Sequence, residues 1–425
     1  MSVIKFRPRG RRDEHYLSAI DMGGSKVSCL IARENKEGAD FEVVGAGHHG
    51  MQLHGGAPTL EAVENGIRAA VDSAERLAAN RIHSASIAIN GRYLHSRRIG
   101  VDLEIAGGMI TAEDVADSMR EGARIAAADG FSCIHALPVT FRVDGEEIFA
   151  DPTGLTGGFL TTEMLCISSR NSLLENYTNL LARCDLKVDQ FIAGPLASAD
   201  SVLVDDEKEL GVIVLDFGAN TTSYAVYENG MVIGAGGVPM GGGHITKDIA
   251  KIFGTPLGDA ERIKTLYGSA LSGPGDEHRF VDIPQFDVNA ESVRVARTDI
   301  ADVIAPRLEE IFDLIVAKLR EERHAPIGLR RAVITGGGSL LVGALEECER
   351  KLRMRCRRGR PISVYGAPEA LTGPGFATCS GAIRRWPQLN LHGGAHFRLD
   401  REGQSVYPNH SGLFGSAGAW LRARF

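Results

Sequence analysis

The chain has 425 residues, which is too many for one hydrophobic core and enough for roughly two to four packed units. Apolar residues make up 44% and charged residues 24%, an ordinary globular composition, and the net charge of −7 argues against a nucleic-acid-binding protein. The seven cysteines form no C-x-x-C pair, so we expect a reducing cytoplasm and neither a zinc site nor a disulfide framework. No apolar run is long enough to span a bilayer, and the basic start MSVIKFRPRGRRDEH lacks the apolar region of a secretory signal.

The first part of the chain predicts a strand, a glycine turn and a second strand. Residues 1–15 are basic and are expected to be a disordered tail. From Tyr16, the run YLSAIDMGGSKVSCLIARE places Val and Ile at strand spacing on both sides of the glycines. A helix is expected from Pro58 to Asn80, where apolar residues recur at helical spacing, and RIHSASIAIN then predicts a buried strand.

Between about residues 99 and 169 the order of elements changes. The sequence predicts a strand, a helix and three further strands, and the helix carries a capping signature in which Asp114 follows Thr111 by three residues. We therefore expect an inserted small α+β unit here. A long helix (NSLLENYTNLLARCDL), a strand and a further helix (GPLASADSVL) come next.

The second half repeats the pattern of the first. The run GVIVLDFGANTTSYAVYENGMVIGAGGVPMGGGHITKDIAKIF again predicts a strand, a glycine turn, a strand, a hairpin and a helix, which indicates an internal duplication. We then expect a helix-rich stretch over 255–300, a long amphipathic helix over 301–322, and a strand, turn and helix over 330–352. Residues 386–411 lose periodicity and predict a linker.

Two glycine hairpins, at equivalent places in the two halves, are the first candidates for chemistry. The first, DMGGSKV, offers Asp21, Gly23, Gly24, Ser25 and Lys26. The second, LDFGANTTSYAVY, offers Asp216, Gly218, Asn220, Thr221 and Thr222. Glycines let the backbone approach a phosphate, and consecutive N–H groups form an anion-binding nest. One such turn is typical of ordinary loops, but a facing pair predicts a clamp for a polyphosphate, whose Mg²⁺ the two acids can hold through water.

A third glycine motif follows in VITGGGSLLVGALE. A buried strand runs into Gly336, Gly337 and Gly338, and we expect a helix capped near Ser339 directly afterwards. In a doubly wound sheet, a ligand meets the carboxyl end of a strand and the start of a helix at such a place. No Gly-Lys-Ser/Thr follows, so this is not a Walker motif. Separately, Gly242 and Gly243 are either another phosphate-side turn or a packing feature.

The segment HSGLFGSAGAWLRARF has the pattern of a short amphipathic helix. The residues expected to contact a membrane are Leu413, Phe414, Trp420, Leu421, Arg422, Arg424 and Phe425. The apolar ones share one arc of the helix, and arginines beside aromatic residues are typical of a helix lying on anionic lipid. A helix docked on the protein itself is the alternative. Gly415 and Gly418 each cost ~1 kcal/mol within a helix, so we expect this segment to fold only on lipid.

The three glycine motifs, in this order, resemble the phosphate 1, phosphate 2 and adenosine motifs of the superfamily that contains actin, sugar kinases and DnaK-type chaperones. GPLASADSVL and GPGFATCSGAI are similar to its two connecting helices. Within it, the chain resembles the FtsA family of bacterial cell-division proteins over nearly its whole length, in stretches such as HALPVTFRVDG, DPTGLTGGFLTTEMLCIS and GDAERIKTLYGSA. The resemblance implies an α/β, actin-like, duplicated two-lobed fold with ribonuclease H-like halves, an inserted α+β subdomain (1C) and a C-terminal amphipathic helix.

The resemblance also implies a division of the chain. The implied parts are a basic tail (1–15), subdomain 1A (16–99 and 170–210), subdomain 1C (100–169), subdomain 2A (211–254 and 301–385), subdomain 2B (255–300), a linker (386–411) and a membrane-targeting helix (412–425). Glu261 and Lys264 are implied to lie against the nucleoside, although by themselves they would be read as an exposed helix pair. The implied cofactors are ATP and Mg²⁺, with Asp21 and Asp216 holding the metal through water.

One departure from the family pattern bears on catalysis. Family members usually carry D-x-G-G-G-T-T-D, whereas DFGANTTS has Ala219 and Asn220 in place of glycines and Ser223 in place of the acid. The added Cβ atoms narrow the approach of a phosphate, although asparagine tolerates left-handed backbone angles. We expect nucleotide binding to survive. Phosphoryl transfer needs a positioned water and a set metal geometry, so we expect at most a slow or regulatory ATPase.

By resemblance, the chain is expected to polymerise at the cytoplasmic face of the inner membrane at the midcell septum, to anchor FtsZ and the Z ring there, and to recruit later divisome proteins. Its implied partners are the C-terminal peptide of FtsZ through 2B, divisome proteins through 1C, further copies of itself and an anionic membrane surface. Two alternatives are a PilM-like cytoplasmic assembly ATPase and a sugar or acid kinase of the same superfamily. Neither alternative needs the terminal amphipathic helix, which therefore favours the first reading.

Overall fold

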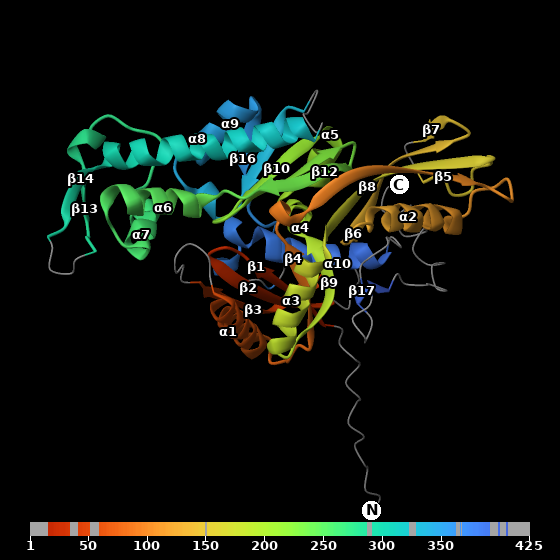
Figure 1. The fold of residues 1–425 in the computed structure, drawn as a ribbon, viewed down its shortest axis with the longest axis horizontal. Coiled ribbons are helices and arrows are strands. Elements are labelled where there is room, and N and C mark those ends of the chain that lie inside the picture. The colour runs from red at the N-terminus through yellow and green to blue at the C-terminus, as the bar shows by residue number, and fades with distance from the viewer. Residues whose placement is uncertain are drawn as a thin grey trace, which may run out of the picture.

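The two halves of the chain form two five-stranded sheets of the same topology. The computed structural model describes residues 16–34, 41–51, 59–148, 151–286, 291–322, 329–362, 366, 368–391, 398–399 and 405–406. The sheets have the orders β3-β2-β1-β4-β9 and β12-β11-β10-β15-β16. In each of them three antiparallel strands continue into two parallel ones. The duplication predicted from the sequence is confirmed (Figure 1).

The strands form where β-branched and aromatic residues recur between glycine turns. The first sheet contains β1 (Tyr16–Met22), β2 (Lys26–Glu34), β3 (Phe41–Gly50), β4 (Ser84–Ile89) and β9 (Lys187–Ala193). The second contains β10 (Val212–Phe217), β11 (Thr222–Glu228), β12 (Met231–Val238), β15 (Arg331–Thr335) and β16 (Arg355–Arg358). The two predicted glycine hairpins join β1 to β2 and β10 to β11.

The strand β10 is buried on both faces and ties the two lobes together. Val212 and Val214 belong to the hydrophobic core of the first lobe. Ile213 and Leu215 point to the opposite face and belong to the core of the second lobe. Because side chains alternate along a strand, one short apolar run serves both cores, as expected for a strand covered on both sides.

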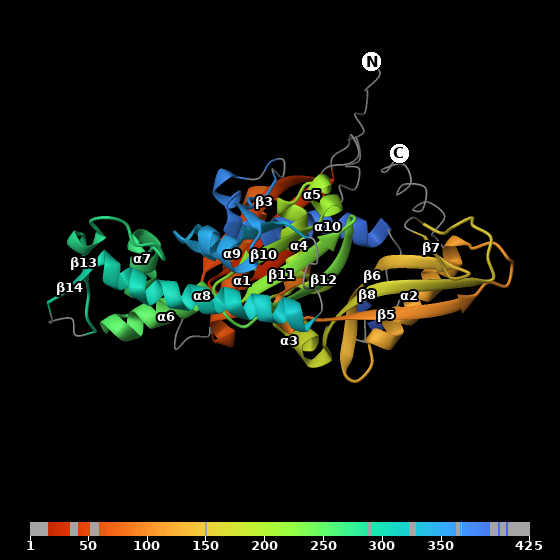
Figure 2. The same ribbon diagram turned by 90° about the horizontal axis from the view of Figure 1, so that it is seen from above.

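Helices cover the outer faces of both sheets and fill the space between them (Figures 1 and 2). The first lobe contributes α1 (Leu60–Ala78), α3 (Asn171–Arg183), α4 (Gly194–Val202) and α10 (Ala377–Leu391). The second lobe contributes α5 (Asp205–Leu210), α6 (Gly242–Phe253), α7 (Leu257–Tyr267), α8 (Arg297–Glu321) and α9 (Ala344–Leu352). The helix predicted over 58–80 is α1, and Thr59 caps it by accepting a hydrogen bond from the Ala62 N–H at 3.2 Å.

The helices α4 and α10 cross at a point that requires glycine. A Cβ atom on Gly381 would lie 1.6 Å from the carbonyl oxygen of Ala197, so no larger residue fits without separating the helices. The helix α10 continues through Leu391, into residues predicted to be linker, and β17 (Arg398–Leu399) pairs with β18 (Ser405–Val406) further on. A linker beginning at Trp386 is therefore wrong, because the helical backbone continues beyond the point where apolar periodicity is lost.

A small α+β unit projects from one end of the molecule (Figures 1 and 2). It consists of β5 (His95–Glu104), α2 (Ala112–Ala126), β6 (Phe131–Val143), β7 (Glu146–Ile148) and β8 (Phe159–Arg170), with the antiparallel strand order β5-β8-β6-β7. The predicted capping box is present at the start of α2: the Thr111 N–H donates to the Asp114 carboxylate at 2.8 Å, and the Asp114 N–H donates to the Thr111 hydroxyl at 3.2 Å. The strand and helix order predicted for this segment is confirmed.

Residues 255–300 are not rich in helix, contrary to the expectation. After α7 the chain makes a 3₁₀ turn (Asp276–His278) and an antiparallel pair of short strands, β13 (Phe280–Ile283) and β14 (Val293–Ala296). The helix predicted over 301–322 begins earlier, at Arg297. The short alternating strands were missed because a four-residue strand gives little periodicity.

The chain after β15 also differs from the expectation. A 3₁₀ turn covers Gly337–Leu340, and α9 begins only at Ala344, so Ser339 does not cap a long helix. The Ser339 hydroxyl instead donates to the carbonyl of Gly336 at 2.7 Å. This bond closes a tight turn formed by the three glycines and Ser339. The serine hydroxyl is therefore used within the turn and does not cap a following helix.

Candidate functional site

A cleft with a volume of about 900 Å³ lies between the two lobes. Most of the candidate residues named from the sequence line it. These are Asp21, Gly23, Gly24, Ser25, Lys26, Asp216, Gly218, Thr221, Gly242, Gly243, Glu261, Lys264, Gly336, Gly337 and Gly338. Three predicted residues do not line it: Thr222, Ser339 and Asn220. Thr222 is buried and donates its hydroxyl to the carbonyl of Met240 at 2.8 Å.

Both glycine hairpins face this cleft, but their surroundings differ. In the first, a Cβ atom on Gly23 would meet nothing closer than its own hairpin, the Lys26 carbonyl at 3.1 Å. In the second, the turn is closed by the Gly218 N–H, which donates to the Thr221 carbonyl at 2.9 Å. Their carboxylates, Asp21 and Asp216, end equivalent strands, β1 and β10. The cleft therefore has an acid and a glycine turn on each side, as the sequence predicted.

The glycine turn at the start of α6 is bound to the second hairpin. The N–H of Gly242 donates to the Gly218 carbonyl at 2.9 Å, and that of Gly243 donates to the Ala219 carbonyl at 2.7 Å. A Cβ atom on Gly241 would lie 2.4 Å from the Gly218 oxygen. The turn therefore fits both interpretations given from the sequence. It lines the cleft, as a phosphate-side turn would, and its close packing fixes the second hairpin.

Two hydroxyl groups hold the carboxylate of Asp216 in place. Ser198 of α4 donates to it at 2.5 Å and Thr378 of α10 at 2.7 Å. The sequence placed both helices at the join of the lobes but did not single out these residues. Their only sequence signal is a small hydroxyl side chain within each connecting-helix motif. The result is an acid oriented by both connecting helices.

The two acids influence each other electrostatically. Burial, and secondly the nearby charge of Asp216, raises the pKa of Asp21 to about 7, while Lys26 acts in the opposite direction. Burial lowers the pKa of Lys26, whose ammonium lies 3.3 Å from the ring centroid of Phe376. Two carboxylates that share a partly buried site and repel each other are suited to a divalent cation.

A cation would be held here through water rather than by a complete set of protein ligands. Across the described parts of the chain, no three Asp, Glu, His or Cys side chains gather as a metal-binding group. Mg²⁺ commonly keeps several waters and takes one or two carboxylates together with substrate phosphates. The pair Asp21 and Asp216 fits that mode, because each ends a strand that points into the cleft.

The third glycine motif closes one wall of the cleft. Gly336 has φ of +82°, and a Cβ atom there would lie 2.4 Å from a carboxylate oxygen of Asp216. At Gly338 the Cβ atom would lie 2.7 Å from the ring of Phe217. Glycine is thus required for the backbone to pass this closely, and a planar group in the cleft would meet backbone rather than side chains here.

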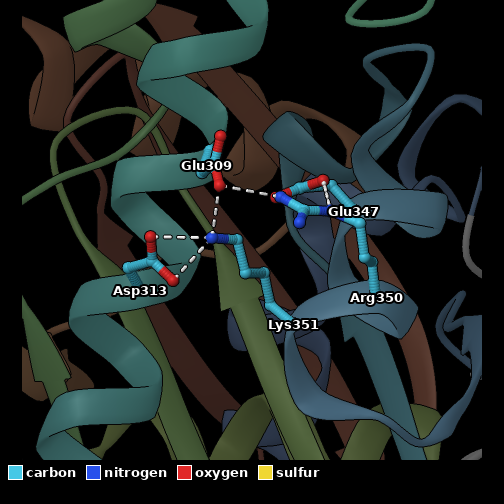
Figure 3. A network of polar contacts seen from close by, with 5 residues as sticks. All are labelled: Glu309, Asp313, Glu347, Arg350 and Lys351. Carbon is cyan, nitrogen blue, oxygen red and sulfur yellow. Dashed lines mark hydrogen bonds and ion pairs between the residues drawn. The ribbon is translucent and has the colours of Figure 1, made fainter.

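The helix α9, which follows this motif, is held against α8 by ion pairs (Figure 3). The Lys351 ammonium contacts Glu309 at 2.6 Å and Asp313 at 2.7 Å, and Arg350 contacts Glu309 at 2.9 Å and Glu347 at 2.6 Å. Ion pairs between such exposed groups contribute little to stability, because water screens them. Their main effect is to fix the orientation of α9 behind the glycine turn.

Glu261 and Lys264 form one side of the cleft together with a residue that sequence reasoning missed, Thr246. The Lys264 ammonium contacts Glu261 at 2.7 Å, the Thr246 hydroxyl at 2.8 Å and the Gly242 carbonyl at 3.1 Å. Thr246 in turn donates to Glu261. The pair is therefore more than an exposed surface pair, since it connects α7 to the glycine turn at the start of α6.

Asn220 contacts the opposite lobe. A Cβ atom on Gly24 would lie 2.7 Å from the side-chain Cγ of Asn220, and one on Gly243 would lie 3.2 Å from its oxygen. Nearby, the Thr221 hydroxyl donates to Asn90 at 3.3 Å, and the Gly91 N–H donates to the Ser223 hydroxyl at 3.1 Å. The altered hairpin thus bridges the two lobes beside the cleft. Asn90 itself lines the cleft and was not predicted.

The predicted membrane-contacting residues from Leu413 to Phe425, and the basic residues 1–15, lie outside the described residues. Within the part that is described, no helix is both long enough and apolar enough to cross a membrane.

The repeated sheets, the glycine hairpins and the interlobe cleft define a protein of the actin-like ATPase fold. The fold is similar to that of the structure "PilM-PilN type IV pilus biogenesis complex", with a TM-score of 0.62 at 18% identity, covering 87% of this chain and 98% of that one. It is also similar to MreB 5 of Spiroplasma citri bound to AMPPNP, with a TM-score of 0.50 at 12% identity, covering 90% and 98%.

Sequence comparison identifies the family. The family model "Cell division protein FtsA" matches residues 213–381, and that of the "SHS2 domain inserted in FTSA" matches residues 91–168. The cell division protein FtsA of Rhizobium meliloti is 31% identical over 436 residues, covering 99% of this chain and 97% of that protein. The one from Escherichia coli K12 is 30% identical, covering 97% and 99%. The chain belongs to the FtsA family of cell-division proteins.

Proposed function

We propose that this cell-division protein binds Mg·ATP in the interlobe cleft, polymerises at the cytoplasmic face of the inner membrane at the division septum, anchors FtsZ there and recruits later divisome proteins. The observation that carries the proposal is the facing pair of glycine hairpins, each with its acid, Asp21 and Asp216, on opposite sides of one cleft. Membership of the FtsA family supports the role in division.

The cleft residues have distinct proposed roles toward the nucleotide. The two hairpins and the turn at the start of α6 would surround the phosphates, and Asp21 with Asp216 would hold Mg²⁺ through water. When bound, the metal supplies positive charge beside the phosphate oxygens. Glu261 and Lys264 would lie against the nucleoside, next to Gly336–Gly338. Ser223 is bonded to the first lobe and is no general base, so hydrolysis would be slow or regulatory.

The proposed partners follow the proposed subdomains, 1A at 16–99 and 170–210, 1C at 100–169, 2A at 211–254 and 301–385, and 2B at 255–300. The FtsZ C-terminal peptide would bind 2B. This part exposes large apolar side chains, with Leu266 61%, Phe280 48% and Phe286 69% exposed, and such patches mark interaction sites. Later divisome proteins would meet 1C, the α+β unit at the other end of the molecule (Figure 1).

Residues 412–425 would attach the protein to the membrane. This attachment would be strong only when the protein polymerises. One short interfacial helix attaches weakly and reversibly. A filament that carries many of them gains residence on the membrane through avidity, often by a factor of about 10²–10⁴. We propose that ATP closes the cleft, favours contacts between subunits and in this way favours attachment.

The test is sedimentation of the full chain with anionic vesicles, with and without Mg·ATP and FtsZ polymers. We expect ATP-promoted pelleting that deletion of 412–425 abolishes and that deletion of 1–15, the matched control, leaves intact. Vesicles of neutral lipid should pellet less protein. Unchanged pelleting of the 412–425 deletion would overturn the membrane role. A PilM-like assembly protein would bind nucleotide but stay in the supernatant with both vesicles and FtsZ.

A further inference from the structure

An arginine that no motif singled out, Arg297, lines the same cleft. It is the first residue of α8, where the chain leaves the β13–β14 pair, and its own N–H donates to the Arg279 carbonyl at 2.8 Å. That bond fixes the backbone at the rim of the cleft. The side chain is half-buried, so its stem packs on the protein while the guanidinium reaches the cavity.

The guanidinium of Arg297 has almost no partners of its own. Its Nε is shut off from water and has no hydrogen-bond acceptor, and one terminal nitrogen makes a single long bond of 3.5 Å to the Tyr267 carbonyl. Among the described residues, no carboxylate forms an ion pair with it, and a cation at the start of a helix gains nothing from the helix dipole. A half-buried, unpaired guanidinium is costly unless a ligand completes its environment.

Its position is at the end of the cleft away from the two acids. Tyr267, its neighbour, lies one turn along α7 from Lys264. The chain beyond Tyr267 is joined to the segment after the third glycine motif, since the Ala270 N–H donates to the Val342 carbonyl at 2.8 Å. Leu341 and Val342 line the cleft here. This end therefore combines the apolar side chains of Leu341 and Val342 with one flat cation, beside the pair of Glu261 and Lys264, whereas the other end has the glycine hairpins and the two aspartates.

We infer that Arg297 binds the base of the nucleotide by placing the plane of its guanidinium against the purine ring. A planar, weakly hydrated guanidinium stacks well on aromatic rings, and apolar walls with few polar groups suit a heterocycle better than a phosphate. The inference rests on the proposed nucleotide site and adds to it a residue that sets affinity for the base. Arg297 is a binding residue and takes no part in transfer chemistry.

The experiment measures binding of three probes to the full chain by calorimetry: Mg·ATP, adenosine, and Mg·tripolyphosphate, which has no base. In Arg297→Met, which keeps the apolar stem, we expect about tenfold weaker binding of Mg·ATP and adenosine. Binding of tripolyphosphate should stay within about twofold. Arg297→Lys keeps the charge but not the plane, and it should recover only part of the loss.

Arg294 provides the matched control, because it is an exposed arginine of β14 that stacks on Phe280, 4.5 Å from the ring centroid. Arg294→Met should bind all three probes like the unaltered chain, and thermal unfolding should show all variants folded. Equal losses for tripolyphosphate and adenosine, no loss in Arg297→Met, or full recovery by lysine would each overturn the assignment. If the unaltered chain fails to bind Mg·ATP, the proposed function itself fails, and this inference with it.

Discussion

The two glycine hairpins have the same place in their sheets but different surroundings. In the first hairpin, a Cβ atom on Gly23 would meet only the Lys26 carbonyl of the same hairpin, at 3.1 Å, and the close neighbour of Gly24 is the side chain of Asn220, at 2.7 Å. The turn at Gly218 accepts hydrogen bonds from the glycines at the start of α6, and it is bonded to the first lobe through Thr221 and Ser223. The two hairpins thus share one topology. Only the second is fixed by hydrogen bonds from the glycines at the start of α6.

The largest expected effect is a difference in folding stability between substitutions at the two hairpins. Gly241→Ala would place a Cβ atom 2.4 Å from the Gly218 carbonyl, and that backbone cannot move without breaking its bond from Gly242. We expect a loss of about 2–3 kcal/mol in the free energy of unfolding. Gly23→Ala, the matched control, meets its nearest atom at 3.1 Å and should cost less than about 1 kcal/mol. Denaturant titration of both variants measures this, and equal losses would contradict the asymmetry.

The next effect is the pH dependence that Asp21 of the first hairpin gives to nucleotide binding and to stability. Because the pKa of Asp21 is raised to about 7, the proton must leave before Asp21 can help to hold a cation. Mg·ATP binding should therefore strengthen by up to about tenfold between pH 6 and pH 8. In the unliganded chain the sign is opposite: the folded state holds the proton that the unfolded chain releases, so stability falls as pH rises toward and through 7.

Asp21→Asn is the control for both pH effects. It cannot ionise, so calorimetric titrations with Mg·ATP should be weak at every pH and should lose the rise between pH 6 and pH 8. Thermal unfolding of the unliganded variant should likewise lose the decline that Asp21 causes. A pH dependence that persists unchanged in Asp21→Asn would assign it to another group.

The smallest expected effect concerns the residue that makes the second hairpin unusual. Asn220 lies between Gly24 and Gly243, where it narrows the space between the hairpins. In Asn220→Gly, we expect the affinity for Mg·ATP relative to Mg·ADP to rise by about two- to fivefold, because the terminal phosphate needs the most room. Competition binding with the two nucleotides measures the ratio. A ratio that does not change would show that the side chain leaves the phosphate path open.

Much of the candidate site could be predicted from local sequence. Asp21, Asp216 and the glycines at 336–338 each stand in a short run that specifies a strand followed by a turn, and the structure brings them to one cleft. The start of α9 was misplaced because a serine after glycines reads as a helix cap, whereas here it closes a 3₁₀ turn. The local sequence thus located the turns, but it did not predict the backbone conformation of the residues after each turn.

The partners of those residues could not be predicted in the same way. Ser198 and Thr378 bond each other and Asp216 although they are far apart in the chain. Arg297 joins the cleft only because β13 and β14 turn the chain back beside α7. A lone serine, threonine or arginine has no pattern of its own, and its role depends on contacts distant in sequence.

The sequence by itself determined the duplicated strands, the two hairpins and the family, because periodicity and glycine turns act over a few residues and occur twice. Only the tertiary structure decided that the second hairpin is held by the glycines at the start of α6, that hydroxyls of both connecting helices orient Asp216, and that an arginine without an ion pair among the described residues lies at the end of the cleft. These features arise from the packing of distant segments against one another, where burial and hydrogen bonding between lobes set the result.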